Sequence, residues 1–278
     1  MDQVLLTGAG GYLGACVLER ARRRGLELRV LEGRLEAIPP GSLEVDAVIH
    51  CAGARRHRAA ELDASNRQGT QRLLQGLKGS PRIVLVSSAS VYGPGRGPTP
   101  IDEHAPVEDA DAYGRSKLAA EGLVRDSGHP FVVFRATALF GQGGGWGNAF
   151  PTAALEAFLG GRPVVLHTPD RPADYLQVGA FADLLLRALG PGDHWDQVFN
   201  AGGPPRSVHG LIHGLARVFE EIQGTRPEIK EAPGPPSGYP LLSTQKLDAC
   251  FGALRQPSDE SIFREMLTMG RPGRAPAR

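Results

Sequence analysis

The feature that most constrains the fold of this chain is the alternation of short apolar runs with segments of helical periodicity. The apolar runs are rich in β-branched residues and lie at 3–7, 26–31, 46–51, 82–88 and 130–135. Continuous runs of this length are typical of strands that are covered on both faces. Helical spacing over 12–24, 62–77 and 113–126 separates most of them. The sequence therefore predicts an α/β fold built on a doubly wound parallel sheet.

The alternation ends near residue 140, where the glycine-rich stretch GQGGGWGN begins. The remaining pattern predicts helices over 149–160, 207–222 and 258–269, strands at PVVLH and QVFNAGG, and a loop at EAPGPPSGYP. Such a region usually builds a lobe over the cleft at the carboxyl ends of the strands. We expect a main domain of residues 1–140 plus 171–202, a smaller C-terminal substrate-binding lobe of 141–170 plus 203–269, and a disordered basic tail of 270–278.

Composition and charge limit the function classes. The chain has 278 residues, is 41% hydrophobic, and carries a formal net charge of +1. This charge gives no electrostatic footprint for nucleic acid or a membrane surface, so we expect a small, neutral or anionic substrate. No run approaches the roughly 20 apolar residues of a membrane span. The three cysteines are far apart and form no CxxC pair, which argues against a disulfide framework or a zinc site. We expect a cytoplasmic protein.

The first predicted strand runs directly into TGAGGYLG, which places Gly8, Gly11 and Gly14 at a tight strand-to-helix turn. Without Cβ atoms the backbone can approach a pyrophosphate, and the amino terminus of the following helix offers free N–H groups. A glycine triplet in this context predicts a dinucleotide site, and therefore an NAD(P)-binding Rossmann domain.

The choice between NAD and NADP rests on the end of the second predicted strand. Glu32 closes that strand, where a carboxylate would accept hydrogen bonds from the ribose hydroxyls and disfavour a 2′-phosphate. This favours NAD. Arg34 and the arginines at 55, 56 and 58 are cations that could hold a 2′-phosphate, so NADP stays open. Each arginine is equally well interpreted as a solvated surface charge.

A pair of reactive side chains opens the helix predicted over 113–126. Tyr113 and Lys117 stand four residues apart in YGRSK, and thus share one helix face. The spacing alone fits a solvated tyrosine and lysine as well as it fits chemistry. The motif SSASVYG, at the end of the fourth predicted strand, supplies the context that the spacing lacks.

Taken together, these motifs resemble the short-chain dehydrogenase/reductase superfamily, specifically its extended branch, the NAD-dependent epimerase/dehydratase family. TGAGGYLG, DAVIHCAG, NRQGTQRLL, SSASVYG, YGRSK and VVFRATALFG occur in the order of that family, over about residues 3–200. The resemblance implies that Tyr113, Lys117 and Ser88 are catalytic. A free phenol titrates near pH 10, so proton exchange by Tyr113 near neutrality needs a neighbouring cation such as Lys117. Ser88 would hold the substrate oxygen.

The matching motifs also suggest further contacts. We expect the cofactor to touch Tyr12, Leu13, Cys51, Ala52, Gly53 and Asn66, besides the glycines, Glu32, Arg34, Tyr113 and Lys117. Asn66 could equally cap backbone groups of a helix turn. Tyr92 is expected to pack in the cleft wall. His209 and His213 could share a helix face, but no third ligand accompanies them, and we interpret them as surface residues. The resemblance also makes a homodimer an alternative to a monomer.

Departures from the family pattern bear on the reaction. Ala89 and Ser90 stand where dehydratases carry an Asp–Glu pair, so an epimerase or reductase is expected in place of a dehydratase. Sugar-nucleotide members usually carry an arginine where this chain has Ala173, and a pair of acids where it has Gly179–Ala180.

We expect Ser88, Ser90 and Arg171 to contact a substrate, with a sugar nucleotide favoured over another hydroxylated or carbonyl metabolite. A non-catalytic cofactor-binding scaffold is a third interpretation, and the intact Ser88, Tyr113 and Lys117 argue against it. The stretch 33–45 is short for the helix and strand that the family places there, which leaves the choice of cofactor open.

Overall fold

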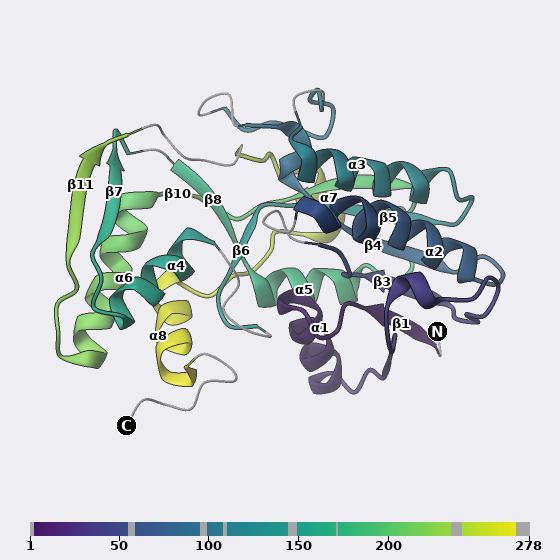
Figure 1. Cartoon of the computed structure of the whole chain (residues 1–278), viewed down its shortest axis with the longest axis horizontal. Helices are drawn as coiled ribbons and strands as arrows, with labels where there is room; N and C mark the ends of the chain where they lie inside the picture. Colours follow the sequence, from purple (N-terminus) through teal and green to yellow (C-terminus); the bar gives the residue numbers. More distant parts are fainter. Residues whose placement is uncertain are drawn as a thin grey trace.

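The computed structural model describes residues 3–54, 59–94, 99–107, 110–143, 149–170, 172–234 and 241–270. Its centre is a six-stranded parallel sheet with the strand order β2-β1-β3-β4-β5-β9 (Figure 1). The strands are β1 (Val4–Thr7), β2 (Leu28–Val30), β3 (Ala47–His50), β4 (Arg82–Ser88), β5 (Phe131–Ala136) and β9 (Gln197–Ala201). The predicted doubly wound α/β sheet is confirmed.

Side chains of the central strands alternate between two cores, as the period of a strand requires. Leu6, Ile49 and Phe134 are buried in the core on one face of the sheet. Leu5 and Val48 are buried on the other face. Because both faces are covered, these strands read in the sequence as continuous apolar runs.

The helices cover the two faces in pairs. On one face lie α1 (Tyr12–Arg23) and α5 (Val178–Arg187), which contact each other. On the other lie α2 (Gly69–Gly76), preceded by the π-helical turn η3 (Asp63–Gln68), and α3 (Ala112–Arg125). Figure 1 shows α3 above β4 and β5, and α1 and α5 below them.

The stretch between β2 and β3 contains one 3-10 turn, η1 (Leu35–Ala37), in place of a further helix and strand. The parallel strand order runs directly from β2 through β1 to β3. The shortness of this stretch in the sequence therefore has a structural counterpart at the edge of the sheet.

The smaller lobe has its own buried core. It is formed by α4 (Phe150–Leu159), α6 (Val208–Gln223) and α8 (Asp259–Met269), together with the parallel pair β7 (Val164–Thr168) and β11 (Ile229–Pro233). A three-stranded sheet of β6 (Ala138–Phe140), β8 (Pro172–Gln177) and β10 (Pro205–Ser207) joins it to the large sheet. The lobe lies on the left of Figure 1, beside the carboxyl ends of the large sheet.

Several elements differ from the sequence prediction. Within the segment 171–202, α5 packs on the large sheet and β9 belongs to it, whereas β8 pairs with β6 and β10. β11 extends into the stretch predicted as a loop, because its backbone pairs with β7. α7 (Gln245–Phe251) was not predicted either. The division into domains stays a prediction, and residues 271–278 of the predicted tail lie outside the described residues.

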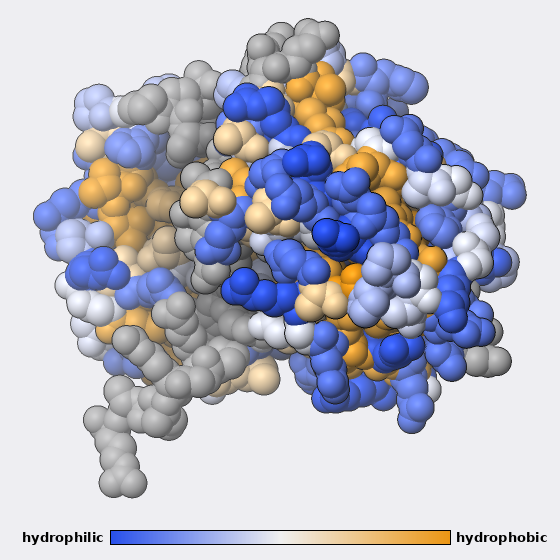
Figure 2. Space-filling model, turned by 45° about the vertical axis from the view of Figure 1, so that its right-hand side comes forward, coloured by the Kyte–Doolittle hydropathy of each residue, from blue (hydrophilic) through white to orange (hydrophobic). Residues whose placement is uncertain are grey.

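Hydrophilic residues dominate the face of the sheet domain in Figure 2, with hydrophobic residues in narrower areas between them. Among the described residues, no helix combines the length and the apolar character that a membrane span requires.

A buried ion pair ties α3 to the sheet. Glu121 is fully buried, and its carboxylate accepts hydrogen bonds from Nη2 of Arg135 at 2.8 Å and from Oγ of Ser87 at 2.5 Å. Arg135 on β5 also donates to the hydroxyl of Tyr92 at 2.9 Å. The half-exposed Arg125 is a second cationic partner of Glu121, at 2.8 Å. One carboxylate therefore joins α3, β4 and β5.

Replacement of this carboxylate is expected to destabilise the fold strongly. Glu121→Gln leaves the guanidinium of Arg135 buried without a full counter-charge, which costs about 3–5 kcal/mol. The matched variant Arg125→Gln removes only the half-exposed partner and should cost less than about 1 kcal/mol. Urea unfolding of both variants measures the difference, and equal losses would contradict this account.

Candidate active site

A cavity of about 890 Å³ lies at the carboxyl ends of the central strands, between the sheet and the lobe. Lobe residues such as Phe150, Ala173 and Tyr175 form one wall. The other wall brings together eleven residues that the sequence singles out: Gly8, Gly11, Tyr12, Leu13, Gly14, Cys51, Gly53, Ser88, Ser90, Tyr113 and Lys117. Residues from four separate motifs thus converge on one space.

The glycine loop is packed too tightly for side chains. Gly8 has a φ of 72°, and a Cβ there would lie 2.6 Å from the backbone nitrogen of Ala52. A Cβ at Gly14 would clash with the carbonyl of Gly8. Gly11 precedes α1 without a side-chain cap, and the first residues of α1 line the cavity. An uncapped helix amino terminus beside close-packed backbone suits the pyrophosphate of a dinucleotide.

Two serine hydroxyls lie at the end of β4. Oγ of Ser88 accepts a hydrogen bond from the backbone N–H of Ser90 at 3.2 Å and donates to Oγ of Ser90 at 3.1 Å. The local bond fixes the direction of Ser88 at the point where the strand becomes a 3-10 turn. Both residues line the cavity.

The start of α3 is held against this turn by a glycine and a cap. Asp111 accepts a hydrogen bond from the N–H of Gly114 at 2.8 Å and so caps the helix. A Cβ at Gly114 would clash with the carbonyl of Ser90. Gly114 therefore permits the approach that puts Tyr113 and Ser88 on one cavity. Neither Asp111 nor Gly114 was identified from the sequence, although the glycine stands inside YGRSK.

Lys117 is buried below this surface, with 8% of its area exposed. Its Nζ donates a hydrogen bond to the carbonyl of Val86 at 3.1 Å. Burial lowers the pKa of Lys117 to about 8, against opposing effects of Cys51 and Glu121. The side chain is thus still mainly an ammonium ion at neutral pH.

Two of the groups around Lys117, Cys51 and His50, are neutral. Burial raises the pKa of the Cys51 thiol to about 12, although Lys117 acts in the opposite direction. Burial, followed by the charge of Lys117, lowers the pKa of His50 to about 3. The neutral ring of His50 lies between two hydroxyls, 2.7 Å from that of Thr7 and 3.0 Å from that of Thr70. The ammonium of Lys117 is therefore the main positive charge in this part of the cavity wall.

Asn66 lies behind the cavity wall. Its Oδ1 accepts a hydrogen bond from the N–H of Ala54 at 2.8 Å, and its Nδ2 donates to Oγ of Ser116 at 2.8 Å. Ser116 in turn donates to the carbonyl of Tyr113 at 2.7 Å. Asn66 thus links the loop after β3 to the first turn of α3.

Some predicted site residues are not among the described residues that line the cavity. Glu32 and Arg34 are exposed after β2, Ala52 packs against Gly8, and Asn66 is buried behind Gly53. Arg171 and the arginines at 55, 56 and 58 lie outside the described residues. Their predicted roles stay predictions.

Tyr92 differs from its predicted place in the cleft wall. It is 3% exposed, does not line the cavity, and donates its hydroxyl hydrogen to Oδ1 of Asn200 at 2.7 Å. Its ring lies 5.0 Å from the guanidinium carbon of Arg135. The polar neighbours of a buried hydroxyl decide its position, and they come from strands distant in the sequence.

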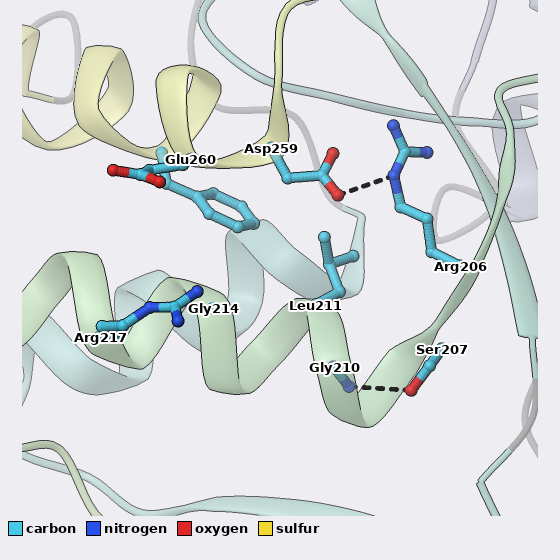
Figure 3. Close-up of a pocket in the computed structure, with 9 residues that line it drawn as sticks. Arg206, Ser207, Gly210, Leu211, Gly214, Arg217, Asp259 and Glu260 are labelled. Carbon is cyan, nitrogen blue, oxygen red and sulfur yellow. Dashed lines mark hydrogen bonds and ion pairs between the residues drawn. The ribbon is translucent and has the colours of Figure 1, made fainter.

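A second, smaller cavity of about 270 Å³ lies in the lobe between α6 and α8 (Figure 3). Its charged residues include Arg206, which donates a hydrogen bond to Asp259 at 2.9 Å. The described residues that line it include none from the four motifs of the large cavity.

The structure offers no metal site in the part of the chain that it describes. There, no group of three or more His, Cys, Asp or Glu side chains could hold a metal ion. Nε2 of His209 lies 3.0 Å from the carbonyl oxygen of His167 and donates a hydrogen bond to it.

Comparisons with known proteins agree with this geometry. A model of the NAD dependent epimerase/dehydratase family matches residues 4–202. The chain is 31% identical over 296 residues to a UDP-glucose 4-epimerase of Azospirillum brasilense, covering 86% of this chain and 83% of that protein. It is 29% identical over 271 residues to a dTDP-4-dehydrorhamnose reductase of Mycobacterium tuberculosis, with 88% and 86% covered. The structure of RMD from Pseudomonas aeruginosa complexed with NADPH superposes with a TM-score of 0.80 at 23% identity, covering 96% and 98%.

A buried carboxylate lies next to the lobe wall of the cavity. Asp174, between the lining residues Ala173 and Tyr175, accepts hydrogen bonds from the N–H of Gly203 and from Oγ1 of Thr137. Burial raises its pKa from 3.8 to about 6, although these bonds act to lower it. Folding therefore shifts Asp174 toward its protonated form, relative to the unfolded chain.

The pH dependence of stability should report this residue. A carboxyl whose pKa is raised on folding stabilises the protein fully below about pH 4, and the contribution is lost as the pH rises through about 6. Between these limits the wild type should lose about 3 kcal/mol relative to Asp174→Asn, which does not titrate. Unfolding free energies of both proteins at several pH values measure this, and parallel curves would contradict it.

Proposed function

Because this chain belongs to the NAD dependent epimerase/dehydratase family, we propose that it is an NAD(P)-dependent epimerase or ketoreductase that acts at a secondary hydroxyl or ketone of a sugar nucleotide. The observation that carries the proposal is the convergence of Ser88, Tyr113 and Lys117 on the cavity that the glycine loop also lines. The predicted family is confirmed, and with it the dependence on a nicotinamide dinucleotide.

Three side chains and the glycine loop have separate roles in the proposed reaction. The nicotinamide, when bound, accepts or donates a hydride. Tyr113 exchanges a proton with the substrate oxygen, while the ammonium of Lys117 favours the phenolate form of Tyr113. The hydroxyl hydrogen of Ser88 turns from Oγ of Ser90 to the same substrate oxygen and orients it. The loop of Gly8, Gly11 and Gly14, with the amino terminus of α1, holds the pyrophosphate.

The residues after β4 support the choice of reaction class. An elimination of water needs an acid and a base of its own. Ala89 is fully buried and apolar, and Ser90 is bonded to Ser88. An epimerase or ketoreductase needs only the serine, the tyrosine, the lysine and the cofactor. A dehydratase is therefore not proposed.

One observation favours a second candidate, a reductase or dehydrogenase of a metabolite that is not a nucleotide. Among the described residues that line the cavity, Lys117 is the sole cation, and Ala173 stands where the family resemblance predicts an arginine. A diphosphate needs positive charge or several donors to replace its water. Oxidation and reduction assays with sugar nucleotides and with simple ketones distinguish these candidates.

The first experiment identifies the cofactor and tests the tyrosine. Denaturing the purified protein and analysing the released nucleotide by chromatography and mass shows whether NAD or NADP is retained. Near-stoichiometric NAD supports an epimerase, which regenerates its cofactor in each turnover, whereas little retained nucleotide supports a reductase.

Tyr113→Phe should lower kcat by about 100-fold or more while leaving nucleotide binding within a few-fold, because one proton donor is lost. Full activity of this variant would sink the proposal.

A second test uses the lowered pKa of Lys117. The ammonium form is present below pH 8 and is lost above it, so kcat/KM for the dinucleotide should fall on a basic limb near pH 8. Lys117→Arg stays positively charged above pH 8 and should move this basic limb to higher pH, whatever the overall activity of the variant. Lys78→Arg, at an exposed position, is the matched control and should keep the wild-type limb. A limb that stays in place in Lys117→Arg would assign it to another group.

A further inference from the structure

Tyr12 joins the glycine loop to a distant part of the chain. It is the first residue of α1 and lines the cavity, and its hydroxyl donates a hydrogen bond to the carbonyl of Gly141 at 2.9 Å. The two residues are 129 positions apart. A phenylalanine at position 12 would fill the same space but could not make this bond.

A second contact supports the first. Gly143 lies against Tyr12 so closely that a Cβ at this position would come within 2.8 Å of Cε2 and 2.9 Å of the backbone oxygen of Tyr12. Gly141 itself has a φ of 103°, which favours glycine over any other residue. Residues 141–143 are therefore shaped to meet the tyrosine, and we call this contact the Tyr12 tie.

The tie connects the two walls of the cavity. On one side, Tyr12 belongs to the loop that faces the pyrophosphate position. On the other, Gly141 directly follows β6, whose Ala138 and Leu139 line the lobe wall, and Phe150 lines the same wall at the start of α4. Separating the walls would break the hydrogen bond and uncover the ring of Tyr12.

We infer that Tyr12 is a positioning residue that keeps the glycine loop and the lobe wall together around a bound dinucleotide, and thereby sets how fast the dinucleotide dissociates. The inference rests on the proposed function, since it assumes that a nicotinamide dinucleotide binds in this cavity. It assigns to the hydroxyl of Tyr12 a role that the glycine motif does not require. The retention of the cofactor, which separates an epimerase from a reductase, then depends partly on this tie.

The test measures the dissociation rate of NADH and of NADPH from the whole protein. Stopped-flow displacement of the bound reduced dinucleotide, followed by its fluorescence, gives the rate constant. Tyr12→Phe removes one oxygen atom and one hydrogen bond, and should raise the rate by about two- to tenfold. Gly143→Ala pushes residues 141–143 away from the ring and should also raise it.

The control repeats the glycine substitution where space is open. A methyl group on the Cα of Gly122 in α3 would meet no atom within 4 Å beyond the backbone of its own helix, so Gly122→Ala should release the dinucleotide at the wild-type rate. All measurements are made far below the unfolding temperature of each variant, so that a general loss of stability does not move the rate. Tyr12→Phe tests the tie even if Gly143→Ala fails to fold.

The outcomes separate this inference from the proposed function. If wild type binds a dinucleotide and Tyr12→Phe releases it at the same rate, the Tyr12 tie has no such role and the proposed function stands. If Gly122→Ala accelerates release as much as Gly143→Ala, the effect is unspecific and the inference is overturned. If neither NADH nor NADPH binds the wild type, the proposed function fails and the inference fails with it.

Discussion

The buried carboxylate of Glu121 is the interaction on which the arrangement of the site depends. It is bonded to Ser87 on β4 and to Arg135 on β5, and it stands one helical turn after Lys117 on α3. Burying an ion pair is favourable only when its hydrogen bonds are nearly complete, so the pair tolerates few other positions of α3. The same contact that closes the core therefore fixes the distance between the helix of Tyr113 and the strand of Ser88.

The electrostatics of the cavity follow from this packing. Lys117 is buried because it lies on α3, the helix that Glu121 holds against the sheet. Burial removes water from the ammonium group and lowers the pKa of Lys117. Two neighbours of the lysine, Cys51 and His50, stay uncharged, as their pKa values show, whereas the carboxylate of Glu121 is paired with Arg135. A single ammonium ion in a partly dry wall acts on a nearby phenol more strongly than the same charge would in water. The partial loss of water around Lys117 is thus part of what lets one lysine stabilise the phenolate of Tyr113.

Much of the fold and part of the site could be predicted because they depend on local pattern. A stretch of about ten residues is enough to recognise each of the five apolar runs, the glycine loop and YGRSK. The missed features depend on partners elsewhere in the chain. β8 pairs with β10, Tyr92 is bonded to Asn200, and Gly114 matters because of the carbonyl of Ser90. For Glu32 and Arg34 the opposite holds. Their position in the sequence predicts contact with the cofactor, but both are exposed and neither is among the described residues that line the cavity.

The two departures from the sugar-nucleotide pattern have different physical meanings. Gly179 makes room for the guanidinium of Arg20, which pairs with Asp183 one turn later on α5. A side chain at Gly179 would displace that arginine, so the missing acid reflects the packing of α1 on α5. Ala173, in contrast, lines the cavity. Only the second departure changes the surface that a substrate meets, and only it bears on which substrate the protein accepts.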